Sequence, residues 1–187
     1  MTPILVILFV GIADFGRIFA AGIVADAAAR DAAEIAAQTY LSEPPSDLTA
    51  PSAPGDAAAY YADLHRKAAL VACAEMDPLP GTDQAADGTC TTWPIVRACV
   101  HDGVDPLCGD SVEGFRADVP AECPSLSSPA WTSSQAGRSE RWVEVRVCYR
   151  FRSLLNLPLF SLGDFSIERT RSFVIPCYFK LGTAACG

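Results

Sequence analysis

Histidine is scarce in this chain of 187 residues, which has only two, His65 and His101. A Ser-His-Asp triad would have to use one of them, and no neighbouring residue supports either as a catalytic base. The sequence also lacks a nucleophile elbow, a phosphate-binding loop, a metalloprotease helix motif and a dinucleotide-binding fingerprint. We therefore predict that the chain is not an enzyme and that it takes no cofactor.

Positive charge is also in short supply. Lys and Arg total 14 against 22 Asp and Glu, which gives a formal net charge of −8. Nucleic-acid binding requires a positive surface, so the composition argues against DNA or RNA as a partner. It argues equally against a polybasic segment that binds anionic lipid headgroups.

Cysteine is absent before residue 73, and no C-x-x-C pair occurs anywhere, which weakens zinc and thioredoxin-like interpretations. An even set of cysteines outside an apolar N-terminal segment is typical of a chain that folds in an oxidising compartment. We expect several disulfides, with buried free thiols as the alternative, and the sequence does not choose their connectivity. The candidates are Cys73, Cys90, Cys99, Cys108, Cys123, Cys148, Cys177 and Cys186.

Two weaker metal hypotheses fall in one loop region. Zinc would use Cys99, His101 and Cys108, but the cysteines at 90, 99 and 108 include no closely spaced pair and disulfides compete for the thiols. Calcium would use the carboxylates of Asp102, Asp105 and Asp110, whose spacing does not match an EF-hand. We predict no metal site and interpret the acidic loop as solvated, with calcium binding left open.

The N-terminal segment is apolar without interruption over residues 3–13. A bilayer span takes roughly 20 residues, a length that the run reaches only by continuing to Val24 through Asp14 and Arg17. Charges inside a span usually face protein or the interface, and this pair, at i and i+3, can neutralise itself. A secretory signal peptide is one alternative, although no basic residue precedes the run. A buried core helix is the other.

The predicted helix continues to Leu41 with no proline, for roughly 58 Å in all. Alanines recur every fourth residue and form a ridge that lets a neighbouring backbone approach closely. A polar stripe of Asp26, Arg30, Glu34 and Gln38 runs parallel to it. The alanine ridge consists of Ala21, Ala25, Ala29, Ala33 and Ala37 and is widened by Ala28, Ala32 and Ala36.

This N-terminal pattern resembles the TadE/TadG-like family, the pseudopilins or minor pilins of the tight-adherence (Tad, Flp-type) pilus. In that family, an apolar run with a proline leads into a Gly-x-x-Asp-Phe-Gly-Arg-like motif and then an alanine-rich helix. The matching positions here are Pro3, Gly11, Asp14, Phe15, Gly16 and Arg17. The strand-like residues 142–151 resemble a late family strand more loosely.

Family members normally carry a basic leader, a prepilin-peptidase site and a Glu-Phe-like pair before that proline. Those residues would lie ahead of Met1, so the resemblance assigns the processing site to no residue here. Three interpretations stay open: a misassigned start codon, a shortened chain and a member that is not processed.

Beyond the first helix, we expect a proline-rich linker over residues 42–55 and an extracytoplasmic domain over residues 56–187. Asp56 is predicted to cap a second helix, residues 57–76, that buries Tyr60, Leu64, Leu70, Val71 and Ala74 and leaves His65 on its solvated side. Residues 77–137, rich in turn residues, are predicted to be long loops held by disulfides. One short strand is expected within residues 91–100, with Pro94 at an edge or at its start.

The clearest strand covers residues 141–152, where apolar residues alternate with polar ones. Residues 164–179 are predicted to add one or two strands, with core residues Phe165, Ile167, Phe173, Val174, Ile175 and Phe179. The apolar connection over residues 153–163 is expected to be buried, with an exposed contact surface as the alternative.

These patterns predict an α+β fold, pilin-like, with a long transmembrane-then-amphipathic helix, a second helix, a small antiparallel sheet and disulfide-held loops. The resemblance implies a structural subunit of a Tad pilus or secretion system, in the inner membrane or the extracellular pilus. Its partners would be other pilins, inner-membrane Tad assembly proteins and, before assembly, lipid. The predicted packing interface consists of Gly11, Asp14, Phe15, Gly16 and Arg17 together with the alanine ridge. The alternatives are a membrane-anchored adhesin not required for assembly and a protein secreted after signal cleavage.

Overall fold

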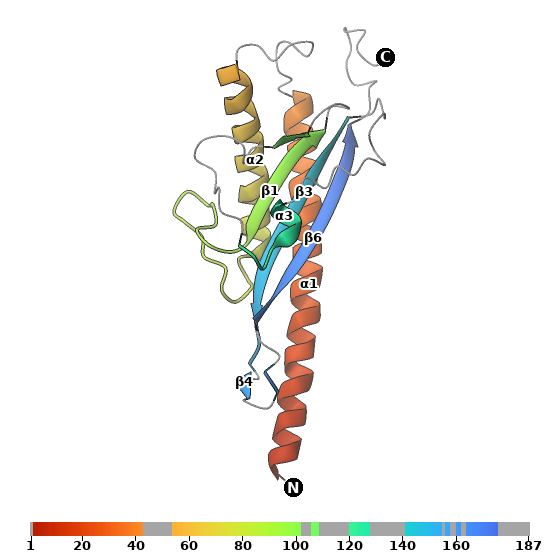
Figure 1. Cartoon of the computed structure of the whole chain (residues 1–187), viewed down its shortest axis with the longest axis vertical. Helices are drawn as coiled ribbons and strands as arrows, with labels where there is room; N and C mark the ends of the chain where they lie inside the picture. The colour runs from red at the N-terminus through yellow and green to blue at the C-terminus, as the bar shows by residue number, and fades with distance from the viewer. Residues whose placement is uncertain are drawn as a thin grey trace.

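The structure is a computed structural model, and it combines one long helix with a shorter helix and an antiparallel sheet (Figure 1). It describes residues 2–42, 54–101, 106–108, 120–127, 141–154, 156–157, 160–161 and 164–175. The predicted α+β class is confirmed.

Helix α1, Thr2–Ser42, is the rod that runs along the whole molecule (Figure 1). Its alanine content and the absence of proline after Pro3 explain its 41-residue length. Helix α2, Pro54–Met76, lies beside the upper part of α1. It begins two residues before Asp56, so the prediction that Asp56 is the N-cap is wrong. Proline suits a first helical position because its fixed φ is already helical and it has no N–H to leave unpaired.

The main sheet has four antiparallel strands in the order β2-β1-β3-β6. Strand β3, Arg141–Arg152, matches the predicted range and lies in the centre, paired with β6, Asp164–Ile175, along its whole length. Strand β1, Ile95–His101, starts directly after Pro94, as predicted, and β2, Pro106–Cys108, is the short outer strand. A separate hairpin pairs β4, Asn156–Leu157, with β5, Phe160–Ser161.

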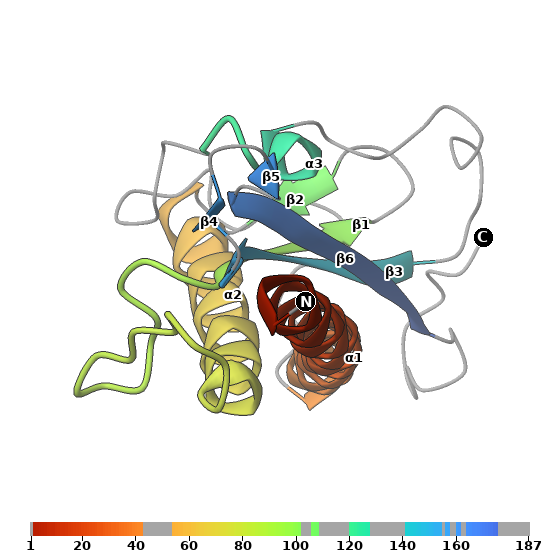
Figure 2. The same cartoon turned by 90° about the horizontal axis from the view of Figure 1, so that it is seen from below.

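The two long helices cover one face of the sheet, and the short helix α3, Pro124–Ser127, lies on the other (Figure 2). The main core lies between α1, α2 and β3. Its β3 side chains are the apolar set predicted from the alternation, namely Val143, Val145, Val147, Tyr149 and Phe151. Alanine on the facing side of α1 lets the helix axis lie close to these larger residues.

The opposite face of β3 is also buried over residues 142–148, although most of its side chains there are polar. Glu144 and Arg146 form a buried ion pair there, and Cys148 is bonded to Cys123 beside Leu126. Glu144 and Arg146 are therefore paired within the protein, whereas Arg152 at the end of the same face is exposed.

Two predictions for α2 are wrong. Ala74 is exposed, whereas Leu64, Ala68, Ala72 and Met76 form the buried face. His65 is buried, because it faces β1, where its Nε2 lies 3.0 Å from the Val96 carbonyl oxygen.

The core prediction for β6 holds at its start and is wrong further along. Ile167 is buried, but Phe173 and Val174 are exposed. Because β6 is the edge strand, its far end has only β3 beside it in the sheet. Leu154, expected to be buried, is also exposed. The side chain of Ile175 and residue Phe179 lie outside what the structure describes.

Candidate helix-packing site

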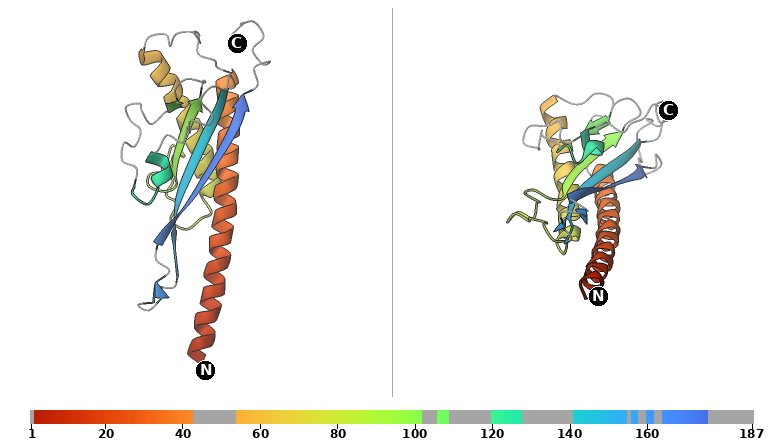
Figure 3. Two further views of the ribbon diagram at one scale, coloured as in Figure 1. Left: turned by 45° about the vertical axis from the view of Figure 1, so that its right-hand side comes forward. Right: turned by 60° about the horizontal axis from the view of Figure 1, so that its bottom comes forward.

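Helix α1 has two parts with different surroundings. Over residues 4–13, here called the arm, it projects below the sheet (Figure 3). The arm has no charged residue, and its large side chains from Ile4 to Phe9 are all exposed. Within the described residues, α1 is the one helix long and apolar enough to cross a bilayer. It is therefore a candidate membrane anchor.

Asp14 marks the point where the arm ends and contact with the folded domain begins. Its side chain is 0 % exposed. One carboxylate oxygen accepts a hydrogen bond from Arg17 Nη1 at 2.9 Å. The other accepts from Ser153 Oγ at 2.6 Å and from the Leu154 backbone N–H at 2.8 Å. The buried charge is thus compensated, and it joins α1 to the segment that follows β3.

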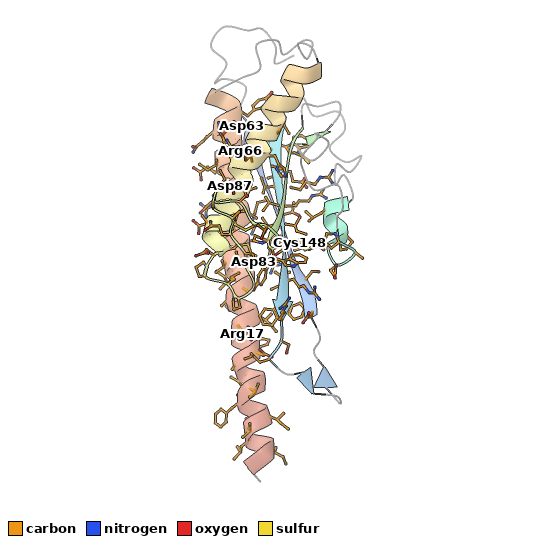
Figure 4. All side chains as sticks on the ribbon, turned by 90° about the vertical axis from the view of Figure 1, so that its left-hand side faces the viewer. Arg17, Asp63, Arg66, Asp83, Asp87 and Cys148 are labelled. Atoms are coloured by element: carbon orange, nitrogen blue, oxygen red, sulfur yellow. A yellow bond between two sulfur atoms is a disulfide. The ribbon has the colours of Figure 1, made fainter. Side chains whose placement is uncertain are left out.

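Arg17 completes this junction from the next turn of the helix. Its guanidinium lies over the Phe151 ring, 5.1 Å from the centroid, while it pairs with Asp14. Phe151 in turn contacts Phe165 of β6, with ring centroids 5.1 Å apart. The predicted i,i+3 pairing of Asp14 with Arg17 is therefore present, and it also connects the helix to both long strands (Figure 4).

The other motif residues lie on different sides of α1. Gly11 is half-buried, whereas Phe15 is exposed. Gly16 is also exposed, and a Cβ built on it would meet no atom within 4 Å. Among the described residues, none uses the close approach that glycine permits at position 16.

The alanine ridge lies inside the chain's own core. Ala25 and Ala29 are fully buried, as are the flanking Ala28, Ala32 and Ala36. Ala21, Ala33 and Ala37 are almost as inaccessible. We name residues 21–40 the seated segment, because its alanine face rests on α2 and the sheet. The five ridge alanines thus meet partners from this chain.

Two contacts that the sequence did not predict hold β6 against the seated segment. Arg171 pairs with Asp26, a member of the polar stripe, at 2.6 Å. At Gly22, a Cβ would lie 3.2 Å from an Arg169 guanidinium nitrogen, so glycine leaves room for this arginine. Sequence spacing reveals helix-internal pairs, but it carries no signal for partners that lie on a distant strand.

Disulfides hold the segments around β1 and β3, as expected. Cys73 of α2 is bonded to Cys90, and Cys123 is bonded to Cys148 of β3. Cys99 is disulfide-bonded as well. Cys177 and Cys186 and the side chain of Cys108 lie outside the described residues.

The metal hypotheses have little in the structure to support them. In the part of the chain that is described, no three His, Cys, Asp or Glu side chains come together as a metal site. A disulfide sulfur such as that of Cys99 is not the thiolate that zinc binds. The acidic residues Asp102, Asp105 and Asp110 lie outside the described ranges.

Fold and site together define a class of protein: an α+β domain, crosslinked by disulfides, carried on one long helix whose free end is a candidate membrane anchor. Within that class, residues 1–34 match the family model for TadE-like proteins. The match covers the arm, the Asp14 junction and the start of the seated segment, so the resemblance expected from the motif is confirmed over this segment. It associates the chain with the Tad pilus, through a family of structural pilus components that is not known for catalysis. No curated protein and no solved structure matched the chain.

Proposed function

We propose that this chain is a minor pilin or pseudopilin of a Tad-type pilus or secretion system. In this role the arm would hold the chain in the inner membrane and later pack with other subunits, while the disulfide-bonded domain stays on the extracytoplasmic side. The proposal extends to the partners: other pilins or pseudopilins and the inner-membrane Tad assembly proteins, with no nucleic acid. The division into helix, linker over residues 42–55 and domain over residues 56–187 remains part of this proposal.

One observation carries the proposal: a single helix is uncharged and uncovered at its free end and fully seated in a folded domain at the other. A helix that served only to fill a core would have no reason to extend the arm beyond the domain. A simple anchor would not need a buried, hydrogen-bonded Asp14 at the point of exit. A subunit that moves from bilayer to filament needs both an uncharged arm and a rigid connection to its domain.

The packing interface needs one revision in the light of the contacts. The alanine ridge, first proposed as the face between subunits, is occupied by α2 and the sheet of the same chain. The proposed contact between subunits therefore lies on the arm and on the exposed side of α1. The alanines and the Asp14–Arg17 pair serve this contact indirectly, because they fix how the domain sits on α1.

A deletion strain tests the function directly. We expect loss of most pili, counted by electron microscopy, and recovery when the full chain is supplied from a plasmid. Normal piliation without the chain would contradict the proposal. Intact pili with lost surface attachment would favour the adhesin alternative. Removing residues 77–137 is unsuitable for separating the two roles, because this segment contains β1 together with Cys90 and Cys123.

A further inference from the structure

The β4–β5 hairpin leaves the sheet at the same end as the arm. It belongs to the apolar connection over residues 153–163, which contains no charged residue. Figures 1 and 3 show the hairpin beyond the end of the sheet, on the side of the N-terminus of α1. The molecule therefore presents two uncharged segments in the same direction, and they come from opposite halves of the sequence.

The register of the hairpin separates its polar residues from its apolar ones. Asn156 pairs with Ser161 at the end that joins β3 and β6, and Leu157 pairs with Phe160 next to the turn. Leu154, just before the hairpin, has a side chain that is 61 % exposed. The polar pair thus lies nearer the domain and the apolar pair nearer the tip. This order matches the change from headgroups to acyl chains at a membrane surface.

Asp14 fixes the height of this connection on α1. Its carboxylate accepts hydrogen bonds from Ser153 Oγ and from the Leu154 N–H, at 2.6 and 2.8 Å. Asp14 is also the first charged residue after the arm. The connection therefore starts at the level at which the arm starts, and the depth of the arm in a bilayer sets the depth of the hairpin.

Charged side chains gather directly above this level. Arg17 pairs with Asp14, Arg150 pairs with Asp164 at 2.9 Å, and Arg152 is exposed at the end of β3. Figure 4 shows Arg17 above the hairpin. Charges are costly in hydrocarbon, whereas long arginine side chains suit the headgroup region. The hydrocarbon boundary of an anchored chain therefore lies below these charges, which leaves the arm and the hairpin on the lipid side.

We propose that the β4–β5 hairpin is a second membrane contact, with Leu154, Leu157 and Phe160 in the lipid interface beside the arm. The hairpin stays at the interface because its outward backbone groups still need water, which the hydrocarbon centre lacks. A single helix fixes the depth of the domain and leaves its tilt free, whereas a second contact fixes the tilt as well. The inference rests on the proposed function, in which the arm holds the chain in the inner membrane.

Three phenylalanines test this contact in the full chain. Phe160 lies in the hairpin and Phe9 in the arm, whereas Phe173 is 43 % exposed near the other end of the sheet. Each is replaced in turn by the photoreactive p-benzoylphenylalanine, in cells whose phospholipids carry clickable acyl chains. We expect lipid adducts at positions 9 and 160, and about tenfold less at position 173, because only the first two positions reach acyl chains.

The possible outcomes separate the hairpin from the arm. Adducts at position 9 with none above the level of position 173 at position 160 would overturn the inference and leave the arm as the anchor. An adduct at position 160 only with protein would overturn it too. Absence of lipid adducts from both positions 9 and 160 would also contradict the membrane location of the arm. A non-reducing gel checks that the disulfides of each variant have formed.

Tryptophan quenching in vesicles gives an independent measurement. The wild type has three tryptophans, so Phe160→Trp and Phe173→Trp each add one to the same background. In vesicles of phosphatidylcholine with brominated acyl chains, the added fluorescence should be quenched in Phe160→Trp and kept in Phe173→Trp. Equal quenching in the two variants would overturn the inference. Neither result bears on the role in the pilus, which fails instead if the deletion strain keeps its pili.

Discussion

The arm and the seated segment are parts of one helix, yet they follow opposite rules of side-chain size. The arm carries large side chains on all sides, and those of Ile4 to Phe9 and of Ile12 are exposed. The seated segment carries alanine on the side that meets its partners and polar residues on the other. Large apolar residues suit an environment that adapts to them, such as lipid or a facing helix. Alanine suits a fixed neighbour at close range, such as β3.

The contrast between the two segments means that alanine repeats do not by themselves identify a surface between subunits. The ridge and the apolar residues Phe15, Phe19 and Ile23 all lie on α1, but only these three large residues are accessible. Substitutions at the ridge and at its supports should therefore destabilise the domain, whereas substitutions on exposed faces should have small effects.

Enlarging the ridge should have the largest effect. We expect Ala29→Leu with Ala33→Leu to destabilise the folded domain by about 2 to 6 kcal/mol, because each leucine overpacks a closed core. Urea denaturation of the detergent-solubilised full chain, followed by fluorescence, measures the change. Ala27→Leu is the matched control, since Ala27 is exposed, and it should change stability little. A double variant as stable as the control would show that the ridge is not seated.

Removing the junction charge should release the domain from the helix locally. Asp14→Ala leaves the Ser153 hydroxyl and the Leu154 N–H without their acceptor, at a cost of about 2 kcal/mol. The loss of Asp14 costs less free energy at Arg17, because water can solvate its partly exposed guanidinium group. Hydrogen exchange of the Leu154 amide should accelerate, and Asp14→Asn, which keeps one carbonyl oxygen, should accelerate it less. Unchanged exchange in Asp14→Ala would mean that the junction does not close in solution.

A third change concerns Tyr149 of β3, one of the strands on which the seated segment rests. Tyr149 of β3 donates a hydrogen bond to the Pro80 carbonyl oxygen at 2.5 Å, and Tyr149→Phe should cost about 1 kcal/mol. Burial raises the pKa of Tyr149 above its ordinary value of 10.0. The folded chain therefore keeps this proton after the unfolded chain has lost it, and stability falls as the pH rises above 10. Urea titrations at about pH 7 and pH 10.5 should show a smaller fall in Tyr149→Phe; an equal fall would exclude Tyr149 as its source.

The smallest effect is expected on the outside of α2. Asp63 pairs with Lys67 at 2.8 Å and with Arg66 at 2.9 Å, and the hydrogen bond from Lys67 is the main cause that lowers the pKa of Asp63. Asp63→Asn should cost about 0.2 to 1 kcal/mol, because the pair is exposed. The pair contributes above the unfolded pKa and is lost as the pH falls through the lower folded pKa. The difference between Asp63→Asn and the wild type, measured by urea denaturation, should therefore vanish in acid. A difference in stability that persists in acid would exclude this ion pair as its source.

Local patterns predicted the elements well. Alternation over residues 141–152 predicted β3, and proline-free alanine over residues 18–41 predicted the upper part of α1. The partners of these elements were harder to predict, because they depend on contacts between distant parts of the chain. His65 looked solvated among Arg66 and Lys67 until β1 was placed beside it. Likewise, Asp14 was predicted to pair with Arg17, but its second partner lies 139 residues away in sequence, at Ser153.

The burial of the ridge by β3 also sets an order in time. Ala29 is synthesised more than a hundred residues before Val145, the centre of the strand that helps to cover it. At roughly 5 to 20 residues per second, the ridge waits on the order of ten seconds for its permanent neighbour. During that interval β3 does not yet cover the ridge, and a bilayer or a chaperone has to shield the exposed alanines. The late position of β3 therefore delays the complete covering of the ridge until translation is almost finished.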